Sequence, residues 1–369
     1  MTALPLHGAR VLDLSRVLAG PACAMMLGDL GADVIKVERP GSGDESRGWG
    51  PPFDQAGQAA YYLAVNRNKL SVAADLKRDR ELIATLAAGA DVVIENFLPG
   101  ALARAGLDPA QLTTSHPKLI WCTISGFGAK SSRPGYDFVV QAESGWMAIT
   151  GERDGAPMKV GIALADVIAG KDAAIAILAA LTGVARGAPV ERRIAVSLID
   201  SARAALVNAA QNVLVSGKDA QRWGNAHANL VPYQLFHAKD RAIVIAVGSD
   251  AQWAGCANAL GLGAMASDAS LRENRGRLEQ RARVASAITD AVAGLTAAEC
   301  ARMLDAAGVP NGLVKTVAES LSEAGTASAR AGVAPSAGGT VRRRPPKMDE
   351  HGAVIRELGW GAFQAVPET

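Results

Sequence analysis

The chain has 369 residues, and its 38 lysines and arginines nearly balance its 36 aspartates and glutamates, for a formal net charge of +2. This length exceeds what one compact core usually holds, so it predicts two domains or one large domain with an insertion. A balanced charge leaves no surplus for gripping a phosphate backbone, which argues against nucleic acid as the main partner. The cysteines form no CxxC pair, so neither a zinc knuckle nor a disulfide framework is expected; they are Cys23, Cys122, Cys256 and Cys300.

Membrane and export signals are weak in this sequence. The longest strongly apolar stretch, Ala173 to Ala185, has about 13 residues, fewer than the ~20 that a membrane helix needs. Met1 to Ala9 lacks a basic region followed by an apolar core, so it is not typical of a secretion signal. We therefore expect a soluble protein of the cytoplasm, with buried thiols at Cys23 and Cys122.

Strand and helix signals alternate over the first 130 residues. The predicted strands are 9–14, 33–37, 91–95 and 119–125, and the predicted helices are 20–30 and 79–88. Pro21 suits the first turn of the first helix, and Gly31 ends it. The alternation predicts an α/β fold with a parallel, doubly wound sheet, whose ligands bind where the strands end. No GxGxxG follows the first strand, which argues against a typical NAD-binding site, and no Walker loop is present.

The second half begins with a long Ala- and Ile-rich helix over Asp166–Arg186, apolar on most sides and expected to be buried. The further predicted elements are a helix over Asp200–Val215, a polar loop over Lys218–Tyr233, a strand over Ala242–Val247, and helices over Asp250–Leu260 and Gly276–Ala293. Residues 325–346 are rich in Gly, Ala, Ser and Arg, so we expect a surface connection there.

Several stretches, taken together and in order, resemble the family III CoA-transferases, the group that also contains α-methylacyl-CoA racemases. These stretches are 11–21 (VLDLSRVLAGP), 31–40 (GADVIKVERP), 66–69 (NRNK), 95–100 (ENFLPG), 135–138 (GYDF), 160–166 (VGIALAD), 223–227 (WGNAH) and 231–233 (VPY). The sequence departs from the family after Pro345-Pro346, where Lys347–His351 stands in place of a Leu-Leu-Gly-x-His stretch.

The resemblance implies a large doubly wound, Rossmann-like domain built from both chain ends and a smaller α/β domain between them. It also implies an interlocked homodimer in which each chain threads the other. On this basis residues 1–218 form the N-terminal part of a large CoA-binding domain, 219–309 the small domain, and 310–369 a linker and the return to the large domain.

Asp166 is the candidate catalytic residue. Its neighbours, 161–165 and 167–170, are apolar or glycine, and a poorly solvated carboxylate has a raised pKa and is a stronger nucleophile. From the sequence alone, an aspartate at a helix start is more often an N-cap. The resemblance favours the other reading, because Asp166 falls where the transferases carry their nucleophilic aspartate. Both roles are compatible, since a helix N-terminus also stabilises a carboxylate.

The reaction implied by the resemblance moves CoA from an acyl-CoA to a free acid. The enzyme carboxylate attacks the thioester to give a mixed anhydride, which CoA thiolate converts into an aspartyl-CoA thioester; the acceptor acid reverses these steps. Each stage exchanges one activated acyl group for another, so neither ATP nor a metal is required. The single histidines show no metal-ligand spacing.

The resemblance places a further set of residues beside CoA. Arg39 would stack on the adenine and contact phosphate, for which a planar guanidinium is well suited. Taken singly, Lys77 and Arg104 are more typical of solvated surface charges. The full set of expected CoA-lining residues is Arg16, Val17, Leu18, Arg39, Lys77, Asn96, Phe97, Leu98, Arg104, Tyr136 and Asp137.

Tyr136 and Asp137 stand where the racemases carry a His-Asp pair. A phenol with an ordinary pKa near ~10 is a poor base at neutral pH, which argues against racemase activity. The alternative for this pair is structural: Tyr136 packs half-buried, and Asp137 caps a helix over Phe138–Ser144.

Arg222 and His227 are the candidate substrate residues. Their segment resembles the branch that acts on dicarboxylic acids, such as the succinyl-CoA:glutarate transferases, and it lacks the glycine-rich loop of oxalate-handling members. Either side chain could meet a distal carboxylate, although a lone loop histidine is more often only solvent-facing. The hypotheses are therefore a CoA-transferase for small, dicarboxylic acids, an α-methylacyl-CoA racemase or epimerase, and a non-catalytic acyl-CoA-binding protein.

Overall fold

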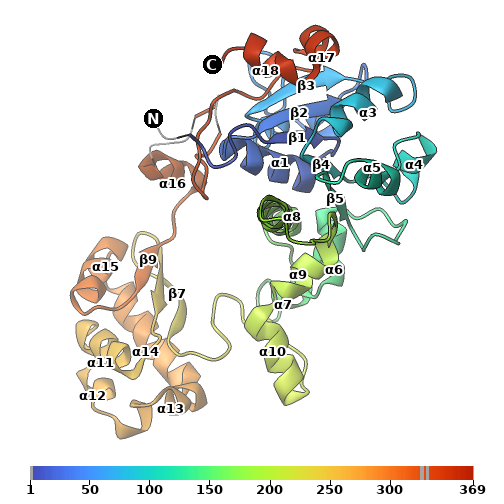
Figure 1. Ribbon diagram of the computed structural model, residues 1–369. Coiled ribbons are helices and arrows are strands. Elements are labelled where there is room, and N and C mark those ends of the chain that lie inside the picture. Colours follow the sequence, from blue (N-terminus) through green and yellow to red (C-terminus); the bar gives the residue numbers. More distant parts are fainter. Residues whose placement is uncertain (1–2, 325–327, 330–331, 369) are drawn as a thin grey trace. The chain divides into compact units, whose positions relative to one another are not determined.

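The computed structural model describes residues 3–324, 328–329 and 332–368 (Figure 1). The chain forms two compact units, and each takes in separate stretches of sequence. Unit 1 comprises Met1–Met147, Lys159–Lys218 and Ala324–Thr369, and unit 2 comprises Ala148–Met158 and Asp219–Glu323.

Unit 1 is built on a six-stranded sheet in the order β3-β2-β1-β4-β5-β6, and every neighbouring pair is parallel. The strands are β1 (Arg10–Asp13), β2 (Asp33–Glu38), β3 (Lys69–Ala73), β4 (Val92–Glu95), β5 (Ile120–Ser125) and β6 (Arg193–Ser197). The order turns back at β1, whose neighbours are β2 on one side and β4 on the other. This confirms the predicted doubly wound α/β sheet and places its crevice where β1 and β4 end.

Helices cover both faces of this sheet. Those of unit 1 are α1 (Ala19–Asp29), α2 (Ala60–Leu63), α3 (Arg80–Ala88), α4 (Ala101–Arg104), α5 (Pro109–Ser115), α6 (Asp137–Glu143), α8 (Leu164–Ala185), α9 (Leu198–Ala204), α10 (Val207–Ser216), α17 (Gly352–Leu358) and α18 (Ala362–Ala365), and α7 (Trp146–Ile149) crosses into unit 2. Short 3-10 turns occupy Glu45–Gly48, Ala269–Leu271 and Gly359–Gly361. The predicted helix over Asp200–Val215 is two helices, because the chain turns at Val207, whose φ is 35°.

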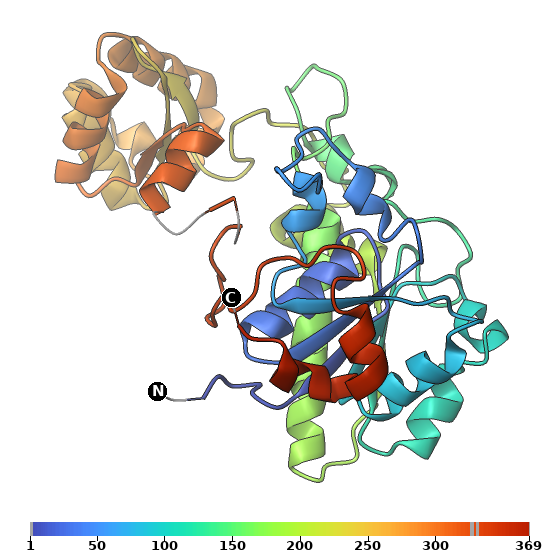
Figure 2. The same cartoon turned by 90° about the horizontal axis from the view of Figure 1, so that it is seen from above.

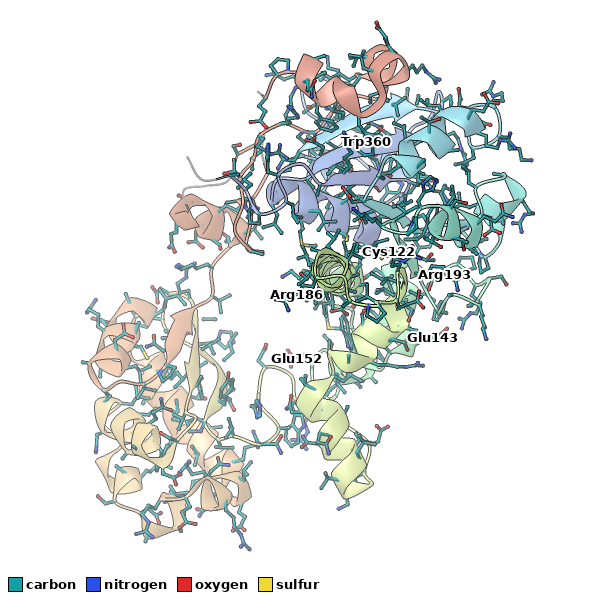
Figure 3. The ribbon with its side chains drawn as sticks, in the orientation of Figure 1. Cys122, Glu143, Glu152, Arg186, Arg193 and Trp360 are labelled. Atoms are coloured by element: carbon teal, nitrogen blue, oxygen red, sulfur yellow. The ribbon has the colours of Figure 1, made fainter. Side chains whose placement is uncertain are left out.

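The C-terminal segment returns to unit 1, as the two ribbon views show (Figures 1 and 2). Asn68 hydrogen-bonds the backbone of Thr340, Arg342 and Arg343 at 2.7–3.0 Å. α17 contacts β3, and Trp360 donates its indole N–H to the carbonyl of Leu86 at 2.9 Å (Figure 3). Part of the predicted connection over 325–346 (325–327 and 330–331) lies outside the described residues.

The departure from the family pattern at Lys347–His351 does not prevent this docking. Asp349 accepts the backbone N–H of Ala73 at 2.8 Å, and His351 Nδ1 accepts that of Ser71 at 3.2 Å. His351 also donates its backbone N–H to the carbonyl of Ser71 at 3.0 Å. These bonds satisfy groups on the outer edge of β3, which has β2 as its only strand neighbour in the described residues.

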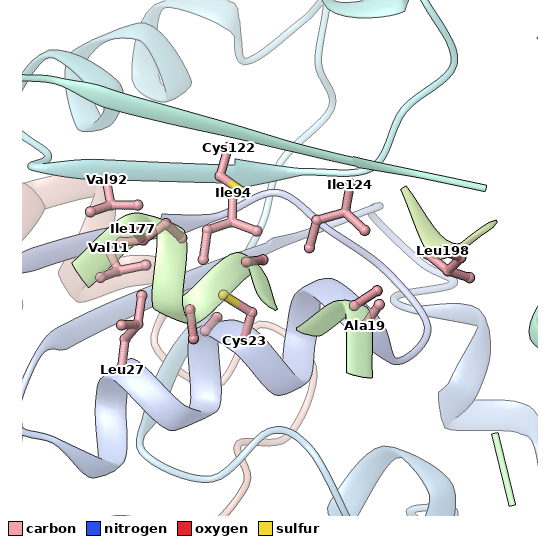
Figure 4. Close-up of a cluster of buried hydrophobic side chains, with 14 of the residues drawn as sticks. Val11, Ala19, Cys23, Leu27, Val92, Ile94, Cys122, Ile124, Ile177 and Leu198 are labelled. Atoms are coloured by element: carbon pink, nitrogen blue, oxygen red, sulfur yellow. The ribbon is translucent and has the colours of Figure 1, made fainter. Parts of the chain in front are cut away.

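The opposite face of the sheet is buried by α1, α8 and α9 (Figure 4). Cys23 of α1 and Cys122 of β5 lie in this cluster, fully buried as the sequence predicted. α8 and α1 approach closely because Gly170 has no side chain: a Cβ built there would lie 2.7 Å from the carbonyl oxygen of Ala19. The close contact fixes the start of α8 beside the loop after β1.

α8 is longer than the apolar stretch that the sequence suggested. With 22 residues, Leu164–Ala185 is long and apolar enough to cross a membrane by length and composition alone. In unit 2, α14 (Arg281–Ala293) and α15 (Ala297–Ala306) meet the same criteria together, with a bend of 118° between them. α8 packs against α1 and the sheet, but only 33% of its most apolar window is buried, so the prediction that this helix is buried holds for one face only.

Unit 2 holds an antiparallel sheet in the order β7-β8-β9, covered by helices around its own core. Its elements are β7 (Tyr233–His237), β8 (Ala242–Ala246), β9 (Asn311–Leu313), α11 (Asp250–Ala259), α12 (Gly263–Ala266), α13 (Asn274–Glu279), α14 (Arg281–Ala293) and α15 (Ala297–Ala306), and α16 (Val317–Ala324) ends at its boundary. The predicted helix over Gly276–Ala293 is divided between α13 and α14 at Gln280.

Of the two predicted domain boundaries, 218/219 coincides with a boundary between the units, whereas 309/310 does not. Unit 2 begins at Asp219 but continues to Glu323, because β9 pairs with β8 and so cannot belong to a linker. It also includes Ala148–Met158, which Arg222 ties to the segment after residue 218.

Candidate active site

A cavity of about 520 Å³ opens where β1, β4 and β5 end, and Asp166 lines it. The sequence-predicted residues that line the same cavity are Arg16, Val17, Asn96, Phe97, Leu98 and Tyr136. They come from the loops after β1 and β4 and from the segment before α6. The structure therefore brings these separate motifs together at the expected edge of the sheet.

Asp166 lies in the first turn of α8, at its third residue. The N-cap position belongs to Ala163, whose side chain makes no capping bond, so the N-cap alternative for Asp166 is wrong. Burial, followed by the negative charge of Asp137, raises the pKa of Asp166 from an ordinary 3.8 to about 7. The side chain is half-buried, and no ion pair in the described part of the chain includes it.

Asp137 supplies the cap that α8 otherwise lacks. Its Oδ1 accepts the backbone N–H of Ala165 at 2.8 Å and that of Asp166 at 3.4 Å. Its Oδ2 accepts Gln141 Nε2 at 2.6 Å, and Gln141 Oε1 accepts the backbone N–H of Val160 at 2.8 Å. The predicted cap on α6 is wrong, because the N-cap of that helix is Tyr136. Asp137 instead fixes the first turn of α8, and its charge acts on Asp166 from close range.

The loop that carries Tyr136 is fixed by two facing glycines. A Cβ built at Gly126 would lie 2.3 Å from the Cα of Gly135, so the two backbones touch where β5 ends. Only glycine permits this approach at either position. Tyr136 follows directly with 58% of its surface exposed, which corrects the half-buried alternative.

The loop after β1 is held by side chains from distant parts of unit 1. Asn96 accepts the backbone N–H of Arg16 at 3.0 Å and donates to its carbonyl at 2.8 Å. Val17 has a φ of 71°, which is strained for a β-branched residue, and its N–H lies 3.2 Å from both carboxyl oxygens of Asp44. Leu18 occupies the N-cap position of α1 and does not line the cavity.

Two further hollows share lining residues with this cavity or with each other. One of about 260 Å³ is lined by Arg39 and Lys77 and shares Arg16 and Phe97 with the first. A shallower groove of about 550 Å³ shares Lys77 with the hollow of Arg39, and it is also lined by Arg78, Arg80 and Arg104. The predicted cofactor residues thus follow one path along the edge of the sheet, with the exceptions of Leu18 and Asp137.

A buried ionic cluster beneath the loops was missed by the sequence reasoning. Lys69 Nζ lies 2.8 Å from Asp13 Oδ2, and Lys36 Nζ lies 3.0 Å from Asp44 Oδ2, all with fully buried side chains. Burial lowers the pKa of Lys69 to about 8, although the charge of Asp13 opposes that change. The sequence does contain a signal for this cluster, because Asp13 and Lys36 are charged residues inside otherwise apolar strands.

Tyr61 was also missed. Burial, and then the charges of Asp166 and Asp137, raise the pKa of its phenol to about 12. Tyr61 therefore senses both carboxylates, and its ring meets that of Trp49 edge-on with centroids 5.0 Å apart. Nothing in the local sequence distinguishes this tyrosine from Tyr62, which is buried.

The two predicted substrate residues belong to unit 2. Arg222 donates to the backbone carbonyls of Ala148, Glu152 and Gly155, so its guanidinium is engaged structurally. His227 packs against Tyr233 with ring centroids 5.1 Å apart, and its Nδ1 accepts a backbone N–H from Asn229 at 3.0 Å. A substrate role for either residue stays a prediction. In the described residues, no group of three or more His, Cys, Asp or Glu could hold a metal ion.

A doubly wound sheet with an unpaired, half-buried carboxylate in its crevice is typical of α/β enzymes. The sequence matches the model of CoA-transferase family III over residues 6–357, so the chain belongs to that family of enzymes. It is 42% identical to succinate--glutarate CoA-transferase of Agrobacterium fabrum, over 85% of this chain and 81% of that one. It is 39% identical to succinyl-CoA:glutarate CoA-transferase of Homo sapiens, over 85% of this chain and 72% of that one.

Solved structures agree with this assignment. A CaiB/BaiF family protein from Brucella suis superimposes with a TM-score of 0.84 at 40% identity, covering 96% of this chain and 99% of that one. Rv3272 from Mycobacterium tuberculosis superimposes with a TM-score of 0.82 at 31% identity, covering 96% of this chain and 100% of that one. The resemblance predicted from the sequence motifs is thereby confirmed, and CoA thioesters are the co-substrates of the family.

Proposed function

We propose that this enzyme transfers CoA between an acyl-CoA and a free dicarboxylic acid, with Asp166 as the covalent carrier. The observation that carries the proposal is the Asp166 carboxyl: half-buried, lining the cavity, and without a cation partner in the described chain. Relatives that exchange CoA between succinate and glutarate favour dicarboxylic substrates.

The carboxylate acts first as a nucleophile. One Asp166 oxygen attacks the thioester carbonyl carbon, the C–S bond breaks, and CoA leaves as thiolate. The thiolate then attacks the Asp166 carbonyl carbon of the resulting anhydride, and the first acid departs as a carboxylate. The acceptor carboxylate attacks the carbonyl carbon of this aspartyl thioester, the C–S bond breaks, and CoA leaves as thiolate while a second anhydride forms. The thiolate then attacks the acceptor's acyl carbon in that anhydride, which releases the new acyl-CoA and the free carboxylate of Asp166. Each bond broken is replaced by one of similar energy.

The environment of Asp166 suits these steps. A carboxylate with few solvating partners is more basic than one in water, and therefore a stronger nucleophile. A pKa of about 7 leaves a large fraction ionised at neutral pH. Asp137 fixes the first turn of α8, so the attacking oxygen is held on a rigid element.

The unpaired cations along the two outer hollows support CoA binding there. Arg39, Lys77 and Arg104 form no ion pair among the residues that the structure describes, and they border connected hollows. Phosphate groups bring the negative charge that such a row of cations favours. Arg16, stacked over Phe97 at 5.3 Å, stands between the outer hollow and the cavity of Asp166.

Mass spectrometry tests the covalent step. Protein incubated with succinyl-CoA and digested under acidic conditions should carry a CoA-sized adduct on the Asp166 peptide, and free glutarate should discharge it. Asp166→Asn should carry no adduct, whereas Asp172→Asn, on the same helix, should carry it as wild type does. An adduct that survives Asp166→Asn would refute the assignment.

The same preparation separates transferase from racemase activity. Solvent deuterium that enters the α-carbon of an acyl-CoA without any acceptor acid would identify a racemase. The exposed Tyr136, which stands where racemases carry histidine, leads us to expect none.

The proposal includes a cytoplasmic homodimer. α10 has no buried residue and exposes Val207, Leu214 and Val215 at 67%, 75% and 77% of their surfaces. Exposed apolar side chains so close together favour a protein partner, here a second copy of the chain. Light scattering should give twice the chain mass, and Leu214→Glu should reduce it; a monomeric wild type would refute the dimer.

A further inference from the structure

Two arginines of unit 2 meet at one tryptophan. The guanidinium carbon of Arg281 lies 4.7 Å from the ring centroid of Trp223, and that of Arg153 lies 5.4 Å from it. Both distances are within the ~6 Å range over which an indole face attracts a cation. Both guanidiniums therefore lie within cation–π range of the same ring.

Neither positive charge is neutralised within the described residues. Arg153 forms no ion pair or side-chain hydrogen bond there, and Arg281 makes one bond, from Nη2 to the carbonyl of Ala228 at 2.9 Å. Burial and the charge of Arg153 lower the pKa of Arg281, so the two guanidiniums repel each other. An anion bound by both would offset that repulsion.

The backbone around the pair is fixed by hydrogen bonds. Arg222 holds the loop that carries Arg153, through the carbonyls of Ala148, Glu152 and Gly155 at 2.7–3.2 Å. Because Arg222 directly precedes Trp223, this clamp joins that loop to the tryptophan. Arg281 opens α14, and its bond to Ala228 ties that helix to the same segment.

We propose that Arg153, Trp223 and Arg281 form an oxyanion-binding site of unit 2, which takes a carboxylate or a phosphate group. A guanidinium presents paired N–H groups that match either anion. A CoA-transferase offers two sources of such a group, the free acid and CoA itself. All three residues lie in unit 2, and the site does not depend on the covalent step proposed for Asp166.

Calorimetry on the full-length Asp166→Asn protein tests the site without turnover. Glutarate is the carboxylate probe, and adenosine 3′,5′-bisphosphate is the phosphate probe. Arg153→Gln should lower the affinity for one of the two probes at least tenfold, which corresponds to about 1.4 kcal/mol. Arg281→Gln should lower the affinity for the same probe. Arg302→Gln, which removes an exposed arginine of α15, should change neither.

The outcomes distinguish the sources. Weaker glutarate binding assigns the site to the acid substrate, and weaker bisphosphate binding assigns it to CoA. Equal binding by all variants, or no binding of either probe to the parent protein, would overturn the proposal. Arg153 makes no hydrogen bond that its loss would break, so circular dichroism should show a folded Arg153→Gln protein. A missing Asp166 adduct combined with a lower affinity in Arg153→Gln would remove the covalent mechanism and keep this site.

Discussion

Asp166 links the chemistry of the cavity to the stability of the fold. Its pKa in the folded protein is about 7, raised first by burial and then by Asp137, against an ordinary 3.8. Above pH 7 the fold therefore holds an ionised carboxylate that water would solvate better in the unfolded chain. The difference between the two pKa values corresponds to about 4 kcal/mol at 1.36 kcal/mol per unit, an upper limit because partial exposure screens the charge.

Whether stability rises or falls with pH depends on which state, folded or unfolded, binds the Asp166 proton more tightly. Because the pKa is higher in the folded state, the contribution of Asp166 to stability is complete below pH 3.8. This contribution is lost as the pH rises to about 7, and above that pH Asp166 causes no further change in stability. Asparagine does not titrate, so Asp166→Asn should be more stable than wild type at about pH 8, by up to about 4 kcal/mol, with little advantage near pH 4.

Urea unfolding followed by tryptophan fluorescence, between about pH 4 and pH 8, measures this difference. Glu81→Gln, at an exposed carboxylate of α3, is the matched control and should stay within about 0.5 kcal/mol of wild type. A difference between Asp166→Asn and wild type that is constant over this range, or that shrinks as the pH rises, would refute the reasoning.

Three further predictions concern unit 1. Asp137→Asn removes the second cause of the raised pKa of Asp166 but keeps an acceptor for the α8 backbone, so the acidic limb of the pH–rate profile should move to lower pH; an unmoved limb would contradict this. Lys69→Met removes the nearer cation from the buried carboxylate of Asp13, which keeps only Lys36 at 3.8 Å, and should cost about 3–5 kcal/mol in urea unfolding, whereas the exposed Lys77→Met should cost little. Gly170→Ala forces α1 and α8 apart and should lower the unfolding free energy by about 1–3 kcal/mol; an unchanged melting temperature would count against the close contact.

Strands β1, β2, β4 and β5 of unit 1 could be predicted from the sequence, although β1 and β2 contain the charged residues Asp13 and Lys36, whereas β3 and β6 could not. β3 begins with Lys69, whose ammonium is buried because Asp13 and Asn66 bind it at 2.8 and 2.9 Å. A partner 56 residues away is invisible to a local pattern. β6 begins with Arg193 and lies at the edge of the sheet, where alternate residues remain exposed.

The candidate site shows the same division. Motif order brought Asp166, Arg16 and Asn96 into one prediction, and the structure places all three at one cavity. The helix-capping rule failed at α8, because the side chain that caps this helix comes from a residue distant in the sequence. α8 begins two residues before Asp166, and its capping acceptor is Asp137, on another helix.

The return of the C-terminus to unit 1 has a consequence for biosynthesis. A ribosome has made every residue of unit 2 by Glu323, but it has not yet made the segment that Asn68 holds or the helix that contacts β3. Unit 2 can fold while translation continues, whereas the edge of β3 stays uncovered until the C-terminal residues have been synthesised. A nonsense mutation after Glu323 would therefore spare unit 2 and leave the β3 edge of unit 1 without its C-terminal cover.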